Sequence, residues 1–177
     1  MSRLFGSILQ NGFVVRDIEA AMRHWIEVLE VGPWFYFEHI PFIDFRYKGE
    51  PSPVDVSLAL ANSGNFQVEL IQQRNDAPSL YRDFIADGHE GLQHVGYGTH
   101  QFDADVARYV EAGYEIGHSG SVGGRGAFVY LLTEGHPGTV VELFDMSSGR
   151  EEVFARIAAA ARTWDGSDPI RTSLPTA

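Results

Sequence analysis

Gly91-Leu92-Gln93-His94-Val95-Gly96-Tyr97-Gly98 places one histidine in an apolar segment whose alternate positions are small. Alternation with period two is typical of a β-strand, and small residues leave one face of such a strand open. The same pattern occurs once earlier, at residues 9–15 (LQNGFVV), where Gln10 stands in the place of His94. The function of the chain depends on whether these two positions lie close together in the fold.

The two strands open the two halves of an internal repeat. A shift of 84 residues pairs Gln10 with His94, and a shift of 73 residues pairs Val-Glu-Leu at 68–70 with Val-Glu-Leu at 141–143. Each half reads as a strand, an amphipathic helix and three further strands. Two such units usually pair so that each buries the face that the other leaves open. The repeat therefore predicts an α+β fold of two βαβββ modules.

The boundaries follow from turn signals and hydrophobic patterns. Residues 34–45 read as one strand interrupted at Pro41, and residues 119–126 read as a glycine-rich loop. The predicted units are a single domain over 1–146, made of module one at about 7–72, a connector at about 73–90 and module two at about 91–146, followed by a C-terminal helix and tail at 147–177.

Composition excludes several classes of function. The chain of 177 residues has a formal net charge of −11 and no cysteine. Nucleic-acid and membrane-surface binding need clustered Lys and Arg, which this sequence lacks. The missing cysteines exclude disulfides and thiolate catalysis. No apolar run approaches the roughly 18 residues of a transmembrane helix, and residues 1–6 are too short for a signal peptide. We therefore expect a cytoplasmic protein.

Four polar residues stand at repeat-equivalent positions. Gln10 and His94 belong to the first strand of each half, and Glu69 and Glu142 to the apolar last strands. A buried carboxylate is costly unless its charge is compensated, and a divalent metal is one such compensation. One imidazole, two carboxylates and one amide oxygen suit zinc, nickel, cobalt, manganese or iron. Each residue alone is more often an ordinary strand residue, but their equivalence favours one divalent metal ion bound by all four.

Aromatic residues are dense near the expected site. As a group they favour a small-molecule substrate with an apolar or aromatic portion. We predict substrate contacts for Trp34, Tyr36, Phe45, Tyr97, Phe128 and Tyr130. Candidates to bind a substrate anion, each also typical of an ordinary surface residue, are His39, Arg74, Gln93, His100 and Arg125.

Four segments resemble the vicinal oxygen chelate superfamily, which includes glyoxalase I, methylmalonyl-CoA epimerase, extradiol dioxygenases and bleomycin-resistance proteins. They are FVVRDIEAA at 13–21, VELI at 68–71, GLQHV at 91–95 and PGTVVEL at 137–143. The resemblance, over about 7–146, implies a half-open mixed β-sheet barrel of two βαβββ modules with helices outside, and a homodimer. It also implies one metal bound by the first and last strands of each module, here Gln10, Glu69, His94 and Glu142. Many members carry His where this chain has Gln10, although some glyoxalase I enzymes use a Gln, Glu, His, Glu set.

The glyoxalase-like and epimerase-like branch, which the chain resembles most, implies a metal-dependent isomerase, epimerase or lyase. Such an enzyme chelates two neighbouring substrate oxygens and removes a proton next to a carbonyl through an enolate or enediolate. Glu142 is the first candidate for the base and Glu69 the second. The alternatives are a metal-free binding protein of the bleomycin-resistance kind, a relative that uses its carboxylates without metal, and a ring-cleaving dioxygenase. Gln10 disfavours the dioxygenase, because the iron facial triad uses two His and one carboxylate.

Overall fold

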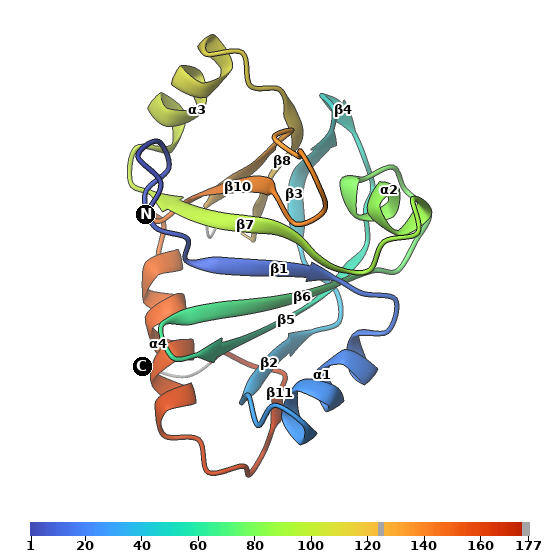
Figure 1. The fold of residues 1–177 in the computed structure, drawn as a ribbon, viewed down its shortest axis with the longest axis vertical. Helices are drawn as coiled ribbons and strands as arrows, with labels where there is room; N and C mark the ends of the chain where they lie inside the picture. The colour runs from blue at the N-terminus through green and yellow to red at the C-terminus, as the bar shows by residue number, and fades with distance from the viewer. Residues whose placement is uncertain (124–125, 175–177) are drawn as a thin grey trace.

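A computed structural model describes residues 1–123 and 126–174, and these residues form one curved mixed sheet with four helices (Figure 1). The strands are β1 (Gln10–Val14), β2 (Trp34–Phe37), β3 (Phe42–Tyr47), β4 (Glu50–Pro51), β5 (Val56–Ser63), β6 (Phe66–Gln73), β7 (Gly91–Thr99), β8 (Ile116–Val122), β9 (Ala127–Leu131), β10 (Val140–Asp145) and β11 (Ile170–Arg171). The helices are α1 (Ile18–Glu27), α2 (Leu80–Ala86), α3 (Phe102–Glu111) and α4 (Arg150–Arg162). None of the helices in the described ranges is long and apolar enough to cross a membrane.

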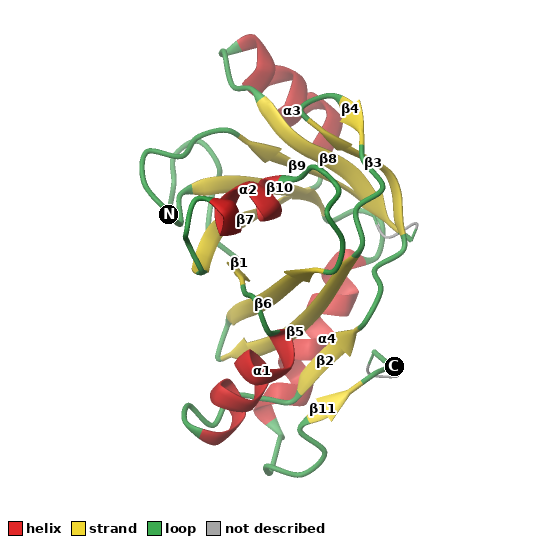
Figure 2. Cartoon of the chain, turned by 90° about the vertical axis from the view of Figure 1, so that its right-hand side faces the viewer, coloured by secondary structure: helices red, strands yellow, loops and turns green. Residues whose placement is uncertain are grey.

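The sheet is built from the predicted repeat. The first half comprises β1, α1, β2, β5 and β6, and the second comprises β7, α3, β8, β9 and β10. In each half the first strand pairs in parallel with the last, and β1 pairs antiparallel with β7 at the centre. The strand order is β11-β2-β5-β6-β1-β7-β10-β9-β8-β3-β4, and the edge strands β11 and β4 do not pair with each other. The barrel is therefore half open, as predicted, and Figure 2 shows the sheet curving from one edge to the other.

The segment predicted as one strand over 34–45 forms two strands near opposite ends of the sheet. β2 pairs with β5 in the first half, whereas β3 pairs with β8 in the second. The chain around Pro41 therefore connects the two halves, which a local hydrophobic pattern does not reveal.

The pairing of β3 also makes a strand of residues that the sequence predicted to be a loop. β8 extends to Val122 because its backbone groups find partners on β3. Gly120 allows this approach, since a Cβ at that position would lie 3.3 Å from the Cα of Phe45. The loop prediction is wrong for residues 119–122, and residues 124–125 lie outside the part that the structure describes.

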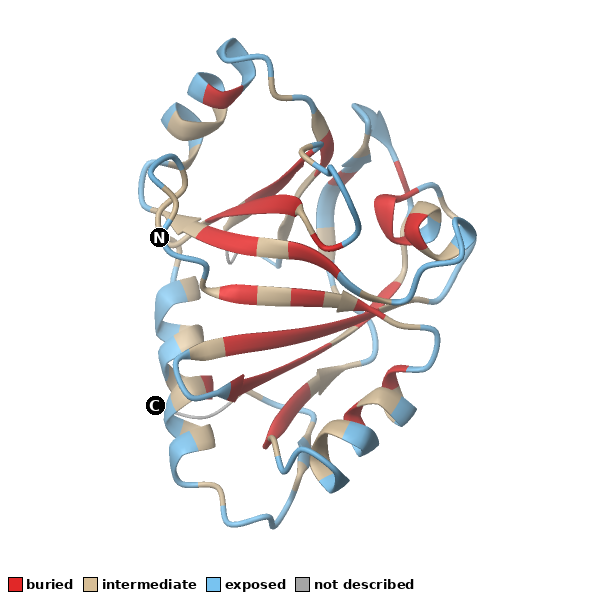
Figure 3. Cartoon of the chain, in the orientation of Figure 1, coloured by how far each residue is buried: buried red, intermediate tan, exposed pale blue. Residues whose placement is uncertain are grey.

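Side-chain alternation separates an inner and an outer face of the sheet. In β5, Ala59 and Ala61 pack on the outer face with α1, while Leu58 and Leu60 pack on the inner face with α4. α1 and α3 lie on the outside, as predicted. α2 and α4 pack instead against inner-face residues, at different parts of the barrel. Figure 3 shows the buried residues running along the central strands, which is where the first and last strands of each half meet.

The C-terminal segment returns to the first half of the sheet. Ile157 of α4 is fully buried with Phe35 and Leu60, and β11 adds to the edge beside β2. The docked helix and the added strand give the predicted tail a defined place in the fold, over the inner face of β2 and β5.

Buried His118 in β8 predicts a loss of stability in acid. Its Nε2 accepts the N–H of Leu80 at the start of α2 (2.6 Å), and burial, together with the charges of His94 and Lys48, lowers the pKa of His118 to about 3. The unfolded chain takes up this proton near pH 6.5, so the free energy of unfolding falls as the pH drops from about 6.5 towards 3.

We expect urea titrations to show about 2 kcal/mol less stability at pH 4.5 than at pH 7 from this residue alone. His118→Gln keeps an acceptor for Leu80 but does not titrate, so its stability should depend less on pH. Equal pH dependence in the wild type and the variant would contradict the assignment.

Candidate metal centre

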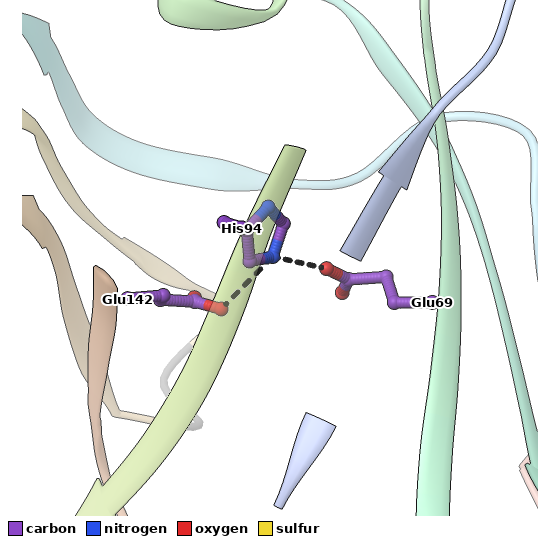
Figure 4. A group of neighbouring side chains, drawn as sticks. All are labelled: Glu69, His94 and Glu142. Atoms are coloured by element: carbon purple, nitrogen blue, oxygen red, sulfur yellow. Dashed lines mark ion pairs between the residues drawn. The ribbon is translucent and has the colours of Figure 1, made fainter. Parts of the chain in front are cut away.

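Glu69, His94 and Glu142 converge at the centre of the inner face. They come from β6, β7 and β10, and Figure 4 shows the two carboxylates approaching the imidazole from opposite sides. Nε2 of His94 lies 3.2 Å from Oε2 of Glu69 and 3.4 Å from Oε2 of Glu142. All three residues are buried, and their ligand atoms lie within 4.8 Å of one another. The repeat thus brings together three of the four positions that the sequence singled out.

The carboxylates carry an uncompensated polar atom each. Among the described residues, Oε2 of Glu69 and Oε2 of Glu142 are buried without a hydrogen-bond partner. Burial opposes a charge on His94, but Glu142 and Glu69 outweigh it and raise the pKa of His94 to about 9, while burial raises the pKa of the Glu69 carboxyl. A site that holds a proton this tightly between two carboxylates also fits a divalent cation, since N and O donors of this kind are ligands for zinc and its neighbours.

A β-bulge orients the imidazole. Gly12 pairs with His94 and Phe13 with Leu92, so Gln93 is the extra residue in β7. The bulge lets Gln93 and His94 both be buried, and Nδ1 of His94 lies 2.7 Å from Oε1 of Gln93. An amide oxygen only accepts, so Nδ1 carries a proton and Nε2 faces the carboxylates. This is the arrangement that supports a metal-ligating histidine.

Two glycines make room for the opposite module's polar residue. A Cβ on Gly12 would lie 1.8 Å from Cε1 and 2.0 Å from Nε2 of His94. A Cβ on the repeat-equivalent Gly96 would lie 2.8 Å from the Phe144 ring and 3.2 Å from Oε1 of Gln10. The small residues of the opening segment therefore accommodate side chains of the protein across the β1–β7 pair.

Gln10 lies beside the three converging residues and lines the same cavity as Glu69 and Glu142. Its Nε2 donates to Oε1 of Gln67 (2.9 Å). A glutamine ligates a metal through Oε1, and the bond to Gln67 uses only Nε2. Ligation by Gln10 stays a prediction that this geometry permits.

The cavity beside the site has a volume of about 290 Å³. Gln10, Glu69 and Glu142 line it on one side. Apolar residues of the sheet, including Phe37, Leu58 and Leu60, form its wall, and Arg150, Val153 and Phe154 of α4 cover it. It is a mostly apolar compartment with polar groups concentrated at one place, which is typical of small-molecule sites.

None of the six aromatic residues predicted to bind substrate lines this cavity. Trp34 and Tyr36 pack on the outer face with α1, and Tyr97 packs there in the cluster of α3. The placement does not fit a substrate contact, because alternation in β2 turns Phe37 inward instead. Phe45, Phe128 and Tyr130 pack together inside the barrel. Of these, Tyr130 reaches the site, with its hydroxyl 3.4 Å from Nε2 of His94.

The predicted anion-binding residues have other partners. His39 pairs with Asp55, Arg74 with Glu19, and His100 with Glu151. Gln93 is buried on His94, and Arg125 lies outside the described residues. Arg150, which the sequence analysis missed, is the basic residue at the cavity, and only the docking of α4 places it there.

Comparison with solved structures shows where this fold occurs. The structure superposes on a hypothetical protein from Bacillus halodurans C-125 with a TM-score of 0.55 and 16% identity, covering 78% of this chain and 93% of that chain. Methylmalonyl-CoA epimerase from Mycobacterium tuberculosis gives a TM-score of 0.55 and 15% identity, with 82% and 91% covered. A Streptomyces coelicolor methylmalonyl-CoA epimerase variant in complex with 2-nitronate-propionyl-CoA gives 0.52 and 19%, with 78% and 93% covered. At these identities the likeness establishes the fold.

Sequence comparison identifies the family. Comparison with curated protein sequences gave no match. The profile of the glyoxalase/bleomycin resistance protein/dioxygenase superfamily matches residues 9–130, which is more than half of the chain. The chain belongs to the glyoxalase/bleomycin resistance protein/dioxygenase superfamily.

Proposed function

We propose that this chain is a divalent-metal-dependent isomerase, epimerase or lyase that removes a proton next to a carbonyl group of a small chelating molecule. The observation that carries the proposal is the convergence of Glu69, His94 and Glu142, with an unpartnered buried oxygen on each carboxylate among the described residues, beside a mostly apolar cavity. Glu69, His94 and Glu142 would hold the metal, with Gln10 as the fourth ligand. The homodimer and the cytoplasmic location remain predictions.

A bound divalent ion would polarise two neighbouring oxygens of the substrate and stabilise the negative charge that develops on them. The chain supplies the proton transfer. A carboxylate oxygen of Glu142 takes the proton from carbon, and the C–H electron pair moves onto the carbonyl to give the enolate or enediolate. Glu69 is the second candidate for this role.

The two carboxylates lie on opposite sides of His94 (Figure 4). Return of the proton from the other side would invert a carbon centre, and return to the neighbouring atom would isomerise the substrate. Loss of a leaving group from the same enolate would be a lyase reaction. Likeness to methylmalonyl-CoA epimerases supports the first of these.

Solvent exchange tests the proposal. The protein is loaded in turn with zinc, nickel, cobalt, manganese and ferrous ions and incubated in deuterium oxide with 2-hydroxyacetophenone or propionyl-CoA as probes. We expect deuterium to enter the carbon next to the carbonyl in at least one pairing, and EDTA to abolish the exchange. Absence of exchange with every metal, or exchange that survives EDTA, contradicts the proposal.

A metal-free binding protein is the second candidate, and the enclosed apolar cavity favours it. In that case His94, whose pKa is raised to about 9, would remain protonated between the carboxylates. Affinity for an apolar ligand that is the same with and without EDTA distinguishes this candidate from the enzyme.

Gln93 is expected to hold the histidine ligand in place. Gln93→Leu removes the acceptor for Nδ1 of His94, and loss of such a partner typically costs 10–100-fold in metal affinity. Gln93→Glu keeps an acceptor and should retain more of the affinity. Competition with a zinc indicator measures both variants, and wild-type affinity in Gln93→Leu would contradict the role.

A further inference from the structure

One face of α4 belongs to the cavity. Arg150, Val153 and Phe154 have i, i+3, i+4 spacing, so they share a face of the helix, and all three line the cavity. Buried Ile157 one turn later anchors the helix on the inner face. Since α4 follows the residues 9–130 that match the superfamily, this cover is a feature of the present chain.

Arg150 is held in a defined position. Its Nη2 donates to the carbonyl of Gly126 (3.2 Å), and its guanidinium lies 5.2 Å from the ring centroid of Phe144. Among the described residues that line the cavity, it is the only Lys, Arg or His. Its charge acts on the site, because it opposes the burial that raises the pKa of Glu69.

The charges of the cavity select the charge of its occupant. Glu69 and Glu142 carry two negative charges, which one divalent ion would cancel. Arg150 then leaves one positive charge in a compartment with apolar walls. Since an unpaired charge is costly in such surroundings, a bound monoanion is favoured over a neutral molecule.

The size of the cavity limits its occupant. About 290 Å³ is at the lower end of the range of about 300–1,000 Å³ that ligand sites occupy. Phe37, Leu58 and Leu60 on one side and Val153 and Phe154 on the other suit a hydrocarbon or aromatic group. The nucleotide of a CoA thioester is too large and too highly charged for this space, and the chain's net charge of −11 repels its phosphates.

We propose that the cavity binds a compact monocarboxylate with an apolar or aromatic group, that Arg150 pairs with its carboxylate, and that α4 makes the site unsuitable for CoA thioesters. A guanidinium binds a carboxylate through two parallel N–H donors, which fixes the orientation of the acid. The charge count rests on the proposed metal-dependent function, whereas the pairing with Arg150 can be measured without it.

Calorimetric titration with three probes tests the proposal on zinc-loaded protein. Mandelate has a ring and a carboxylate, 2-hydroxyacetophenone has the ring without the charge, and lactate has the charge without the ring. We expect mandelate to bind at least about 10-fold more tightly than either of the others. Propionyl-CoA should not displace mandelate.

Variants of α4 separate charge from shape. Arg150→Met should weaken mandelate by about 10-fold or more and leave 2-hydroxyacetophenone within about 2-fold, and Arg150→Lys should restore part of the loss. Arg156→Met is the matched control, because Arg156 pairs with Glu152 on the same helix and does not line the cavity. Val153→Trp should weaken both ring-bearing probes and spare lactate. Melting curves confirm that each variant is folded.

Two results would overturn the proposal: an Arg150→Met variant whose affinities for mandelate and 2-hydroxyacetophenone change equally or not at all, or displacement of mandelate by propionyl-CoA. The same titrations on EDTA-treated protein keep the two proposals apart. If the protein binds no zinc and EDTA leaves mandelate affinity unchanged, the metal-dependent function fails. The Arg150 variants then still decide the question of the carboxylate.

Discussion

Glu142→Gln is expected to lose proton exchange by about 10²–10⁴-fold and zinc affinity by more than about 100-fold. The amide keeps the size of the side chain but removes the charge and the basic oxygen. Oxygen Oε2 of Glu142 is 3.4 Å from Nε2 of His94 and has no hydrogen-bond partner among the described residues, so little in the fold depends on its charge. Deuterium exchange followed by NMR, and calorimetric titration with zinc, measure the two losses.

Glu134→Gln is the matched control, because Glu134 is an exposed carboxylate in the turn that precedes β10. It should exchange protons and bind zinc as the wild type does. If Glu142→Gln keeps wild-type turnover, Glu142 is not the base. If it loses turnover but keeps zinc, the roles of base and ligand lie on different residues, and Glu69→Gln becomes the decisive variant for the ligand.

Gly12→Ala is expected to remove His94 from the site without altering any candidate ligand. The new Cβ would lie 1.8 Å from Cε1 of His94, a distance that no adjustment of bond angles can relieve. The ring must leave its position between Glu69 and Glu142, so zinc affinity should fall by more than about 100-fold. Overpacking of this kind should lower the free energy of unfolding by about 3 kcal/mol. Titration with zinc and urea denaturation measure the two effects.

Gly135→Ala provides the comparison, since a Cβ there meets nothing within 4 Å. Zinc affinity and stability should both stay close to those of the wild type. A Gly12→Ala protein with normal zinc affinity would show that His94 can ligate from another position or does not ligate at all.

The centre of the fold was accessible from the sequence because it depends on the repeat. Gln10 and His94 stand 84 residues apart, and the pairing of β1 with β7 places their strands side by side. The two Val-Glu-Leu segments lie in β6 and β10, each next to a first strand. Period-two alternation then puts all four side chains on one face. Only the number of strands and their order were needed for this part.

The surroundings of the site were not accessible in the same way. A shift of one residue along β2 exchanges the inner and outer faces, so aromatic density alone did not distinguish Phe37 from Trp34 and Tyr36. The crossing of β3 to β8 and the docking of α4 depend on contacts between distant segments. Arg150 carries no local signal that sets it apart from other helix residues.

The bulge at Gln93 explains why this residue was interpreted as an anion-binding candidate. Regular alternation would place adjacent residues on opposite faces of β7, with Gln93 away from the site. The extra residue buries Gln93 with His94 and aligns its amide with Nδ1. Bulges depend on the pairing of two strands, and a single strand's pattern does not reveal them.

The metal content of the purified protein tests the central claim most directly. Elemental analysis is made on the wild type and on His94→Ala, Glu69→Gln and Glu142→Gln, each stripped with EDTA, reloaded with zinc and passed over a desalting column. The convergence of Glu69, His94 and Glu142 predicts one zinc ion per wild-type chain and a loss of zinc in each variant. A wild-type chain that retains no zinc, or variants that all retain it, would contradict a metal centre at these residues.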